Sequence, residues 1–267
     1  MVLDKTFHLL KKRYARQLEN LIITEVRIGL HLTAVALSDN SHGVASTLTA
    51  TQPREHEKKR NFDAFSPSQI KGRKVLELFD PPRQTNITDT LKLAVMNAVS
   101  SKILPDTPYK VLEDADPIDL LDLNGSKNIT MVGAFQSYIK KIAATQNHLK
   151  VLELDKKTFH PEHQKYYVPA EAYQSILPAS DIVIITGLTL LNNTIDALLS
   201  TTSSGARVIV TGPSSSLIPD VLFENNVDII GATKITNPEM LFTIVGEGGS
   251  GYHLFGYCAK KICILKE

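Results

Sequence analysis

Two apolar, β-branched segments of this 267-residue chain end in the same dipeptide, Thr-Gly, and then continue into small polar residues. They read DIVIITGLTLLNN (181–193) and RVIVTGPSSSLIP (207–219). Ligands of open α/β sheets bind beyond the carboxyl ends of the strands, where loops of this kind lie. Neither segment has a Lys or Arg after its Thr-Gly, which favours a polar small molecule or a metal complex over a nucleotide triphosphate. The residues predicted to contact such a ligand are Thr186, Gly187, Asn192, Asn193, Gly212, Pro213, Ser214 and Ser215.

A third loop, MVGAFQSY (131–138), follows another apolar segment. It has one glycine, whereas a dinucleotide-binding turn needs the G-x-G-x-x-G pattern for the close approach of a pyrophosphate. Glu153, however, ends the next apolar segment 20 residues after Gly133, where an acid that binds a ribose would lie. We therefore predict ligand contacts at Gly133 and Phe135 and treat Glu153 as a candidate proton acceptor. An adenosine-type ligand and a merely solvent-exposed Glu153 both stay open.

A literal G-x-G-x-x-G does occur at 246–251 (GEGGSG), but it follows a predicted helix and not a strand, so it lacks the context of a nucleotide site. We interpret this segment as a flexible flap that contributes Gly248 and Gly249 to the ligand site. Glu247 within it is a second candidate proton acceptor. His31, at the tip of a predicted hairpin, is a third catalytic candidate because histidine titrates near neutral pH.

The stretch FHPEH (159–163) offers the only candidate metal ligands of the sequence, His160 and His163. Imidazole and carboxylate groups suit transition metals, but the proline prevents a fixed helical spacing, so an exposed loop is the alternative. The two cysteines, Cys258 and Cys263, form no C-x-x-C pair and are predicted to be small buried hydrophobes. The cofactor is therefore unknown, and a transition metal or a metal complex is kept open.

The charge balance excludes some partners. With 29 basic and 28 acidic residues the formal net charge is +1, so nothing attracts polyanions globally, and we expect neither nucleic acid nor a membrane as partner. The N-terminal 20 residues lack the apolar core of a signal peptide, and the apolar runs are far too short to cross a bilayer. We expect a soluble cytoplasmic protein, and the sequence leaves a homodimer open.

The first half of the chain predicts an α+β domain. A helical pattern at 3–20 is followed by three strands within 21–51, broken at 29–31 and 39–43, which suggests an antiparallel meander. A charged loop (51–65) and two helices (66–79 and 86–104) come next, and a stretch rich in Pro and Asp (105–117) reads as the linker.

The second half alternates between apolar strands and helices, which is typical of a parallel sheet covered on both faces. Strands are predicted at 128–132, 149–154, 181–185, 206–210, 227–230 and 261–265. Helices are predicted at 134–146, 170–177, 192–199, 217–225 and 237–245. The fold class is therefore α/β, with a small α+β domain (1–110) followed by a Rossmann-like domain (111–267).

Several of these stretches together resemble a known family. MVGAFQSYIKKI, LPASDIVIITGLTLLNNTIDALL and ARVIVTGPSSSLIPDVLFENNVDIIGATKITNPE, followed by GEGG, are similar to the second domain of an uncharacterised family described as "putative heavy-metal chelation". IGLHLTAVALSDNSHGVAST and NITDTLKLAVMNAVSS, with its Asn97-Ala98 pair, resemble the first domain. The resemblance implies an enolase N-terminal-like domain followed by a Rossmann-like domain, with the ligand site in the cleft between them.

Three functions follow from these observations. The first is an enzyme or binding protein that acts on a small molecule or metal complex in the interdomain cleft. The second is a transferase that depends on an adenosine cofactor, and the third is a non-catalytic metal-trafficking protein. Whether the chain is an enzyme stays open at this point.

Overall fold

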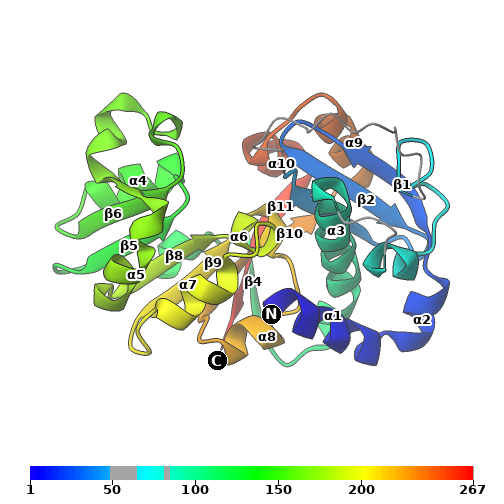
Figure 1. Ribbon diagram of the computed structural model, residues 1–267, viewed down its shortest axis with the longest axis horizontal. Helices are drawn as coiled ribbons and strands as arrows, with labels where there is room; N and C mark the ends of the chain where they lie inside the picture. Colours follow the sequence, from blue (N-terminus) through cyan, green and yellow to red (C-terminus); the bar gives the residue numbers. More distant parts are fainter. Residues whose placement is uncertain (49–64, 81–84, 267) are drawn as a thin grey trace, which may run out of the picture.

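Figure 1 shows the computed structural model, which describes residues 1–48, 65–80 and 85–266. Strands β1 (Ile23–Ile28), β2 (Leu32–Leu37) and β3 (His42–Ser46) form a three-stranded antiparallel sheet in chain order. The predicted meander is therefore confirmed. The predicted charged loop at 51–65 lies outside the described residues except for its last residue.

Helices cover the small sheet on both of its faces. Helix α3 (Asn86–Ile103) packs so closely on one face that a Cβ atom on Gly43 would lie 2.0 Å from the carbonyl oxygen of Ala94. The other face buries Ala34 and Val44 against α9 (Pro238–Gly246) and α10 (Gly251–Tyr257). The C-terminal helices of the chain therefore complete the first domain, as the right-hand half of Figure 1 shows.

Two predicted helices of the first domain differ from the structure. The helix at 3–20 is divided at Tyr14 into α1 (Val2–Arg13) and α2 (Ala15–Asn20). The prediction of a helix at 66–79 is wrong, because this segment forms turns and one short 3-10 helix, η1 (Val75–Phe79). Ser68 and Gly72 have positive φ angles of 72° and 88°, which no continuous right-handed helix can contain.

The break at Tyr14 has a measurable consequence. Its phenol donates to Asp39 Oδ2 at 2.9 Å, and burial together with this hydrogen bond and the nearby negative charge raises the pKa of Tyr14 to about 12. The bond therefore stabilises the fold fully below the ordinary tyrosine pKa, and the stabilisation is lost as the pH rises through 10 to about 12. Tyr14→Phe should lower the unfolding free energy by about 0.5–1 kcal/mol at pH 7. In urea titrations across pH, the difference should shrink above pH 10; a constant difference would contradict the assignment.

The larger sheet has eight strands within the described residues, in the order β4-β11-β10-β9-β8-β5-β6-β7. The strands are β4 (Lys110–Glu113), β5 (Asn128–Val132), β6 (His148–Glu153), β7 (Tyr167–Pro169), β8 (Ile182–Thr186), β9 (Arg207–Thr211), β10 (Ile229–Ile235) and β11 (Ala259–Leu265). The six from β5 to β10 are parallel to one another, which confirms the predicted α/β class. Strand β11 runs antiparallel to β10, and β4 pairs with β11 inside the segment predicted to be a linker.

The central strands of this sheet are apolar on both faces because each face is buried. Ile129 and Met131 pack with Ile139 and Ile142 of α4, while Ile185 belongs to a core that continues into the first domain. The α-helices are α4 (Gln136–Ala143), α5 (Tyr173–Ile176), α6 (Leu188–Leu191), α7 (Ile195–Thr201) and α8 (Asp220–Glu224). The short 3-10 helices are η2 (Leu104–Asp106), η3 (Pro117–Leu120), η4 (Lys156–Thr158), η5 (Pro161–Tyr166), η6 (Ala170–Ala172), η7 (Leu177–Ala179) and η8 (Pro213–Ser215). None of the helices described combines the length and apolarity that crossing a bilayer requires.

The two domains share a packed interface that includes polar contacts. The backbone N–H of Ser46 in β3 donates to Ser214 Oγ at 2.8 Å, and the N–H of Ile218 donates to Ser100 Oγ of α3 at 3.0 Å. One hydrophobic core runs through both domains. The domains are therefore held as one packed unit along this interface.

Candidate functional site

The order of the strands reverses at β5. Strands β6 and β7 continue on one side of β5, whereas β8, β9 and β10 continue on the other. The connections that leave the carboxyl ends of β5 and β8 therefore diverge, and ligands of open α/β sheets bind in the crevice at such a point. Two pockets lie at this edge, and they share Ala134 and Phe135, which lead into α4.

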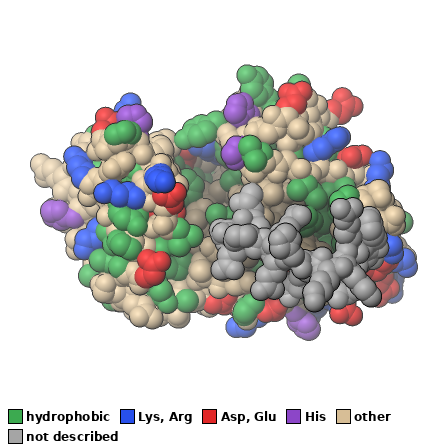
Figure 2. All heavy atoms as spheres, turned by 45° about the horizontal axis from the view of Figure 1, so that its top comes forward, with side chains coloured by type: hydrophobic (Ala, Val, Ile, Leu, Met, Phe, Trp, Pro, Cys, Tyr) green, Lys and Arg blue, Asp and Glu red, His purple; other side chains and the backbone are tan. Residues whose placement is uncertain are grey.

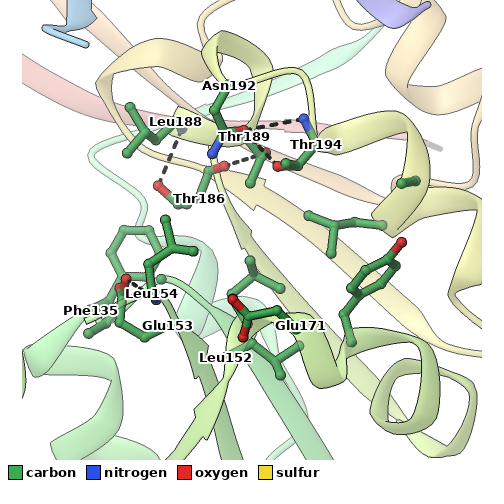
Figure 3. Close-up of a pocket in the computed structure, with 17 residues that line it drawn as sticks. Phe135, Leu152, Glu153, Leu154, Glu171, Thr186, Leu188, Thr189, Asn192 and Thr194 are labelled. Atoms are coloured by element: carbon green, nitrogen blue, oxygen red, sulfur yellow. Dashed lines mark hydrogen bonds between the residues drawn. The ribbon is translucent and has the colours of Figure 1, made fainter. Parts of the chain in front are cut away.

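The first of these, the β5–β8 pocket, has a volume of about 440 Å³. In Figure 3, Thr186, Asn192 and Thr194 lie on one side of it, and Glu153 and Glu171 lie on the other. Apolar side chains make up most of the remaining wall. This combination of an apolar wall and a few polar groups is typical of sites for small molecules. The predicted ligand contacts that line it are Gly133, Phe135, Thr186 and Asn192, together with Glu153, the candidate proton acceptor.

Glu153 joins two loops of this pocket. Its Oε2 accepts a hydrogen bond from Ala134 N at 3.1 Å, and its Oε1 accepts one from Leu154 N at 2.7 Å. The carboxylate therefore fixes the turn after β5, where Gly133 has a φ of 94°. A carboxylate can accept about four hydrogen bonds, so lone pairs are left for a ligand.

We expect Glu153→Gln to lower the unfolding free energy by about 1 kcal/mol, because glutamine has one side-chain oxygen and leaves one of the two backbone N–H groups without its partner. Chemical denaturation measures this loss. The matched control is Glu171→Gln, which changes the other acid of the pocket, an exposed one, and should leave stability unchanged. Equal losses in both variants would contradict the assigned role.

The loop after β8 uses most of its polar groups internally. Thr186 Oγ1 accepts from Leu188 N at 3.3 Å, and Asn192 Oδ1 accepts from the hydroxyl of Thr194 at 2.6 Å (Figure 3). Asn193 does not line the pocket, although it was predicted to contact a ligand. It is exposed with a φ of 59°, a conformation that asparagine tolerates well, so it makes the turn between α6 and α7.

The second pocket, the α4–α10 pocket, has a volume of about 560 Å³. It lies between the first turn of α4 and helix α10, with Thr211, Gly212, Pro213 and Gly231 below, and Figure 2 shows the surface hollowed between its left and right parts. No side chain of the described residues caps the N-terminus of α4. The first turn of a helix presents unpaired N–H groups and a partial positive charge, so this wall favours an anionic group.

A buried network closes one side of the α4–α10 pocket. The Tyr138 hydroxyl donates to Asp116 Oδ1, and Lys261 Nζ donates to Asp116 Oδ2. Burial, followed by the hydrogen bond and the charge of Asp116, raises the pKa of Tyr138 well above its ordinary value. Tyr138 is therefore neutral at physiological pH, with its hydroxyl hydrogen given to Asp116, and Lys261 brings to the pocket an ammonium group that is paired with the same carboxylate. These three residues were not predicted to be part of the site.

Three predicted contacts on the Thr-Gly loops lie in the domain interface and line neither pocket. Ser214 and Ser215 are 1% and 0% exposed. Ser214 Oγ accepts from Ser46 N, and the Ser215 hydroxyl lies 2.6 Å from the carbonyl oxygens of Gly212 and Gly231. Gly187 packs against them, with a Cβ position 3.0 Å from Ser215 N. The structure therefore does not bring these three predicted contacts to either pocket, and the two serine hydroxyls bind the protein itself.

Most of the glycine-rich segment packs against α9 and the first hairpin, and its last two residues, Ser250 and Gly251, line the α4–α10 pocket. A Cβ on Gly249 would come within 2.3 Å of Ile244 Cγ2, and Gly248 lies 4.0 Å from Leu30 Cβ. Glu247 and His31 are exposed. The segment is therefore a tight turn between α9 and α10 and not a flap, and the structure does not bring His31, Glu247, Gly248 or Gly249 to the pockets.

The described residues do not form a metal-chelating cluster of three or more His, Cys, Asp or Glu side chains. His160 Nδ1 and His163 Nε2 each lie 3.5 Å from Glu162 Oε1, and His163 Nδ1 is 3.1 Å from Gln136 Oε1. Burial raises the pKa of the Cys263 thiol to about 12, so this side chain stays protonated and is a poor metal ligand. The donor groups of the described residues therefore do not fit a resident heavy metal.

The fold and the pockets define a two-domain α/β protein whose open sheet carries ligand-sized hollows at its carboxyl edge. The chain belongs to the DUF364 family, described as "Putative heavy-metal chelation", whose model matches residues 116–264. A second model with the same description matches residues 11–100. The family expected from the sequence resemblance is thereby confirmed.

Solved structures show the same fold. The crystal structure of a DUF364 protein of unknown function from Pyrococcus horikoshii has a TM-score of 0.77 at 22% identity and covers 99% of this chain and 100% of that one. One from Desulfitobacterium hafniense has a TM-score of 0.70 at 20% identity and covers 97% and 100%. An uncharacterised protein of Methanocaldococcus jannaschii is 31% identical over 139 residues, 48% of this chain, and the match spans 53% of that relative.

Proposed function

We propose that the protein binds a small polar molecule or metal complex with an anionic group in the α4–α10 pocket. The observation that carries this proposal is the uncapped N-terminus of α4, which lies between the two pockets at the reversal of strand order. Lys261, which pairs with Asp116, brings an ammonium group to the same side, and the Tyr138 hydroxyl donates to Asp116 and holds that carboxylate in place. An anion held there meets favourable charge from the helix and from the ammonium group.

The rest of the pocket suits an apolar or planar part of the ligand. The ring of Phe135 stacks on that of Tyr138 with centroids 5.4 Å apart, and Tyr252 lines the pocket while 74% exposed. Large apolar side chains that stay exposed beside a hollow favour contact with a partner molecule. The ligand class is therefore an anion attached to a ring or a short apolar body.

A metal would enter this pocket as part of its cargo. The family description mentions heavy-metal chelation, and the protein's own side chains supply no chelating cluster in the parts of the chain described. A metal complex whose own organic ligand carries the negative charge agrees with the family description and with the lack of a chelating cluster in the described residues. Elemental analysis of protein purified without an affinity tag tests this, because a resident metal at one equivalent after dialysis would contradict it.

The test uses thermal unfolding with molybdate and with the citrate complexes of iron, nickel and zinc. A probe at about 100 times its Kd should stabilise the protein by roughly 2.7 kcal/mol. Lys261→Gln should weaken binding about tenfold. Lys260→Gln is the matched control, because Lys260 is the neighbouring residue of β11 and pairs with Asp114 in the same way. Equal effects of both variants, or no stabilisation by any probe, would overturn the proposal.

The β5–β8 pocket supports a second candidate, an adenosine cofactor for a transferase. Glu153 ends β6, and the apolar wall would accept an adenine ring. S-adenosylmethionine and AMP are the probes for this candidate in the same thermal assay. Saturable stabilisation that Glu153→Gln weakens and Lys260→Gln does not would support it, and no shift at high excess would remove it.

A further inference from the structure

A third pocket, the α3–β10 pocket, lies between the two domains and has a volume of about 260 Å³. Its walls are the β2–β3 turn (40–44), the C-terminal half of α3 and the end of β10. The described residues that line it share none with either pocket of the sheet edge. On β10, Ala232 lines the α4–α10 pocket and the next residue, Thr233, lines this one, because successive side chains of a strand point to opposite faces.

Asn97, which lines this pocket, carries an unpaired acceptor. It is 2% exposed, and its Nδ2 lies 2.8 Å from Val44 O, 3.3 Å from Ser214 O and 3.4 Å from Pro213 O. All three neighbours are carbonyl oxygens, so the amide nitrogen must face them, and the orientation of the side chain is fixed. Oδ1 consequently points away from them, and it finds no hydrogen-bond partner in the described part of the chain. Such a buried acceptor requires a donor from outside the protein.

Thr233 presents a second unpaired group. Strand β9 ends its pairing with β10 at Gly231, and the N–H of Thr233 donates instead to Ser216 Oγ at 2.9 Å. The hydroxyl of Thr233, which is 8% exposed, has no partner among residues 1–48, 65–80 and 85–266. Two buried polar atoms from different domains therefore line one cavity without a bond from the protein.

The charged side chains that line the pocket are positive, and Asp39, next to the β2–β3 turn, is a carboxylate that acts on Lys102. Lys102 and Lys234 line it, and no Asp or Glu is among its described lining residues. Lys234 pairs with Glu113 at 2.5 Å, so Lys102, an exposed residue at the end of α3, is the cation left for a ligand. His42 also lines the pocket, and burial is the main reason that its pKa is lowered. The imidazole ring of His42 is therefore neutral at physiological pH and does not change the charge of the residues that line the pocket.

We propose that the α3–β10 pocket binds a small organic anion that also carries a hydroxyl group. The hydroxyl would donate to Asn97 Oδ1, the anionic group would accept from Thr233 and face Lys102, and both unpaired atoms would be satisfied. A ligand held by one residue of each domain would tie the domains together. This site is separate from the proposed anion site at the N-terminus of α4, and neither proposal depends on the other.

Glycerate is the probe, and glycerol and propionate are its matched controls, since one lacks the charge and the other lacks the hydroxyl. Glycerate should raise the melting temperature saturably, and the two controls should not. Thr233→Val should weaken glycerate binding about tenfold. The free variant should melt at the same temperature as the parent or above it, because the hydroxyl that it loses makes no bond in the protein. Thr233→Ser keeps the hydroxyl and should keep the binding.

Charge is tested in parallel. Lys102→Gln should weaken glycerate binding, while Lys150→Gln, at an exposed position on β6, should not. Lys261→Gln should also leave glycerate binding unchanged, which separates this site from the α4–α10 pocket. No saturable shift at millimolar glycerate, or unchanged binding in Thr233→Val, would mean that the cavity holds only water and would overturn the proposal.

Discussion

Asn97→Asp is expected to lower the unfolding free energy by about 3 kcal/mol, one of the largest losses that a change of so few atoms can cause in this chain. The substitution keeps the size and shape of the side chain. It replaces the Nδ2 donor, which faces Val44 O, Pro213 O and Ser214 O, by an acceptor. The expected result therefore concerns the hydrogen bonds that join the two domains and not packing.

The physical reason is the burial of every group involved. Asn97 is 2% exposed, so an ionised carboxylate there would face three carbonyl oxygens without water. The group would instead take up a proton and donate once, leaving at least one interface carbonyl without a bond. Binding that proton makes the loss dependent on pH, and the variant should recover part of its stability as the pH falls.

Urea denaturation at several pH values measures this effect. Asn193→Asp is the matched control. This variant makes the same chemical change at an exposed turn and should alter stability by less than about 0.5 kcal/mol. A loss below about 1 kcal/mol in Asn97→Asp would mean that the Asn97 amide does not hold the domains together. The α3–β10 pocket would then need another account of its buried acceptor.

The sequence predicted the strands of the larger sheet because their signal is local. Segments such as 128–132 (NITMV) and 181–185 (DIVII) are mostly apolar and rich in β-branched residues, and they match β5 and β8 within one residue. Burial on both faces causes that pattern, and the pattern needs no knowledge of partners. Strand β4 has no such signal, because three of its four residues are exposed and it forms by pairing with β11 at the far end of the chain.

Part of the candidate site was predicted because the strands that precede it have a local signal in the sequence. Gly133, Glu153 and Thr186 line the β5–β8 pocket because they follow strand ends, which the sequence locates. Ser214 follows a strand end equally well, yet its hydroxyl accepts from Ser46, 168 residues earlier in the chain. A single sequence gives no sign of which domain face covers that loop.

The network of Asp116, Tyr138 and Lys261 in the α4–α10 pocket is the part of the site that the sequence did not predict. Asp116 meets Tyr138 over 22 residues and Lys261 over 145 residues. Each of these residues alone is unremarkable: an aspartate before a proline, a tyrosine on the buried face of a helix, and a lysine in an edge region. Their function as a charged wall arises only when β11 folds back beside β10.

Gly231→Ala is expected to have the second large effect, a loss of about 2–3 kcal/mol together with loss of binding in the α4–α10 pocket. Gly231 lies on β10 between β9 and β11, and it forms the floor of this pocket. A Cβ atom there would come within 2.2 Å of Thr211 Oγ1 and 2.5 Å of Pro117 Cγ. The threonine can rotate, but the proline ring is held in η3, so the strand or η3 must move.

Such a movement reaches the ligand site directly. The residue before Pro117 is Asp116, which holds both Tyr138 and Lys261. Displacing η3 therefore disturbs the pair of Asp116 with Lys261, whose ammonium group we assign to the anion, in addition to filling the floor with a methyl group. Chemical denaturation gives the stability loss, and titration of the folded variant with whichever of the metal-complex probes stabilises the parent gives the change in affinity.

Gly256→Ala is the matched control, because Gly256 lines the same pocket on α10 and a Cβ there meets nothing within 4 Å. Alanine is the better helix former, so this variant should gain up to about 0.5 kcal/mol and keep its binding. Opposite signs for two Gly→Ala changes in one pocket would show that the close packing of β10 on η3 causes the loss. If Gly231→Ala were as stable as the parent and still bound the probe, η3 would be free to move, and the network of Asp116 could not be the rigid wall that the proposed anion site requires.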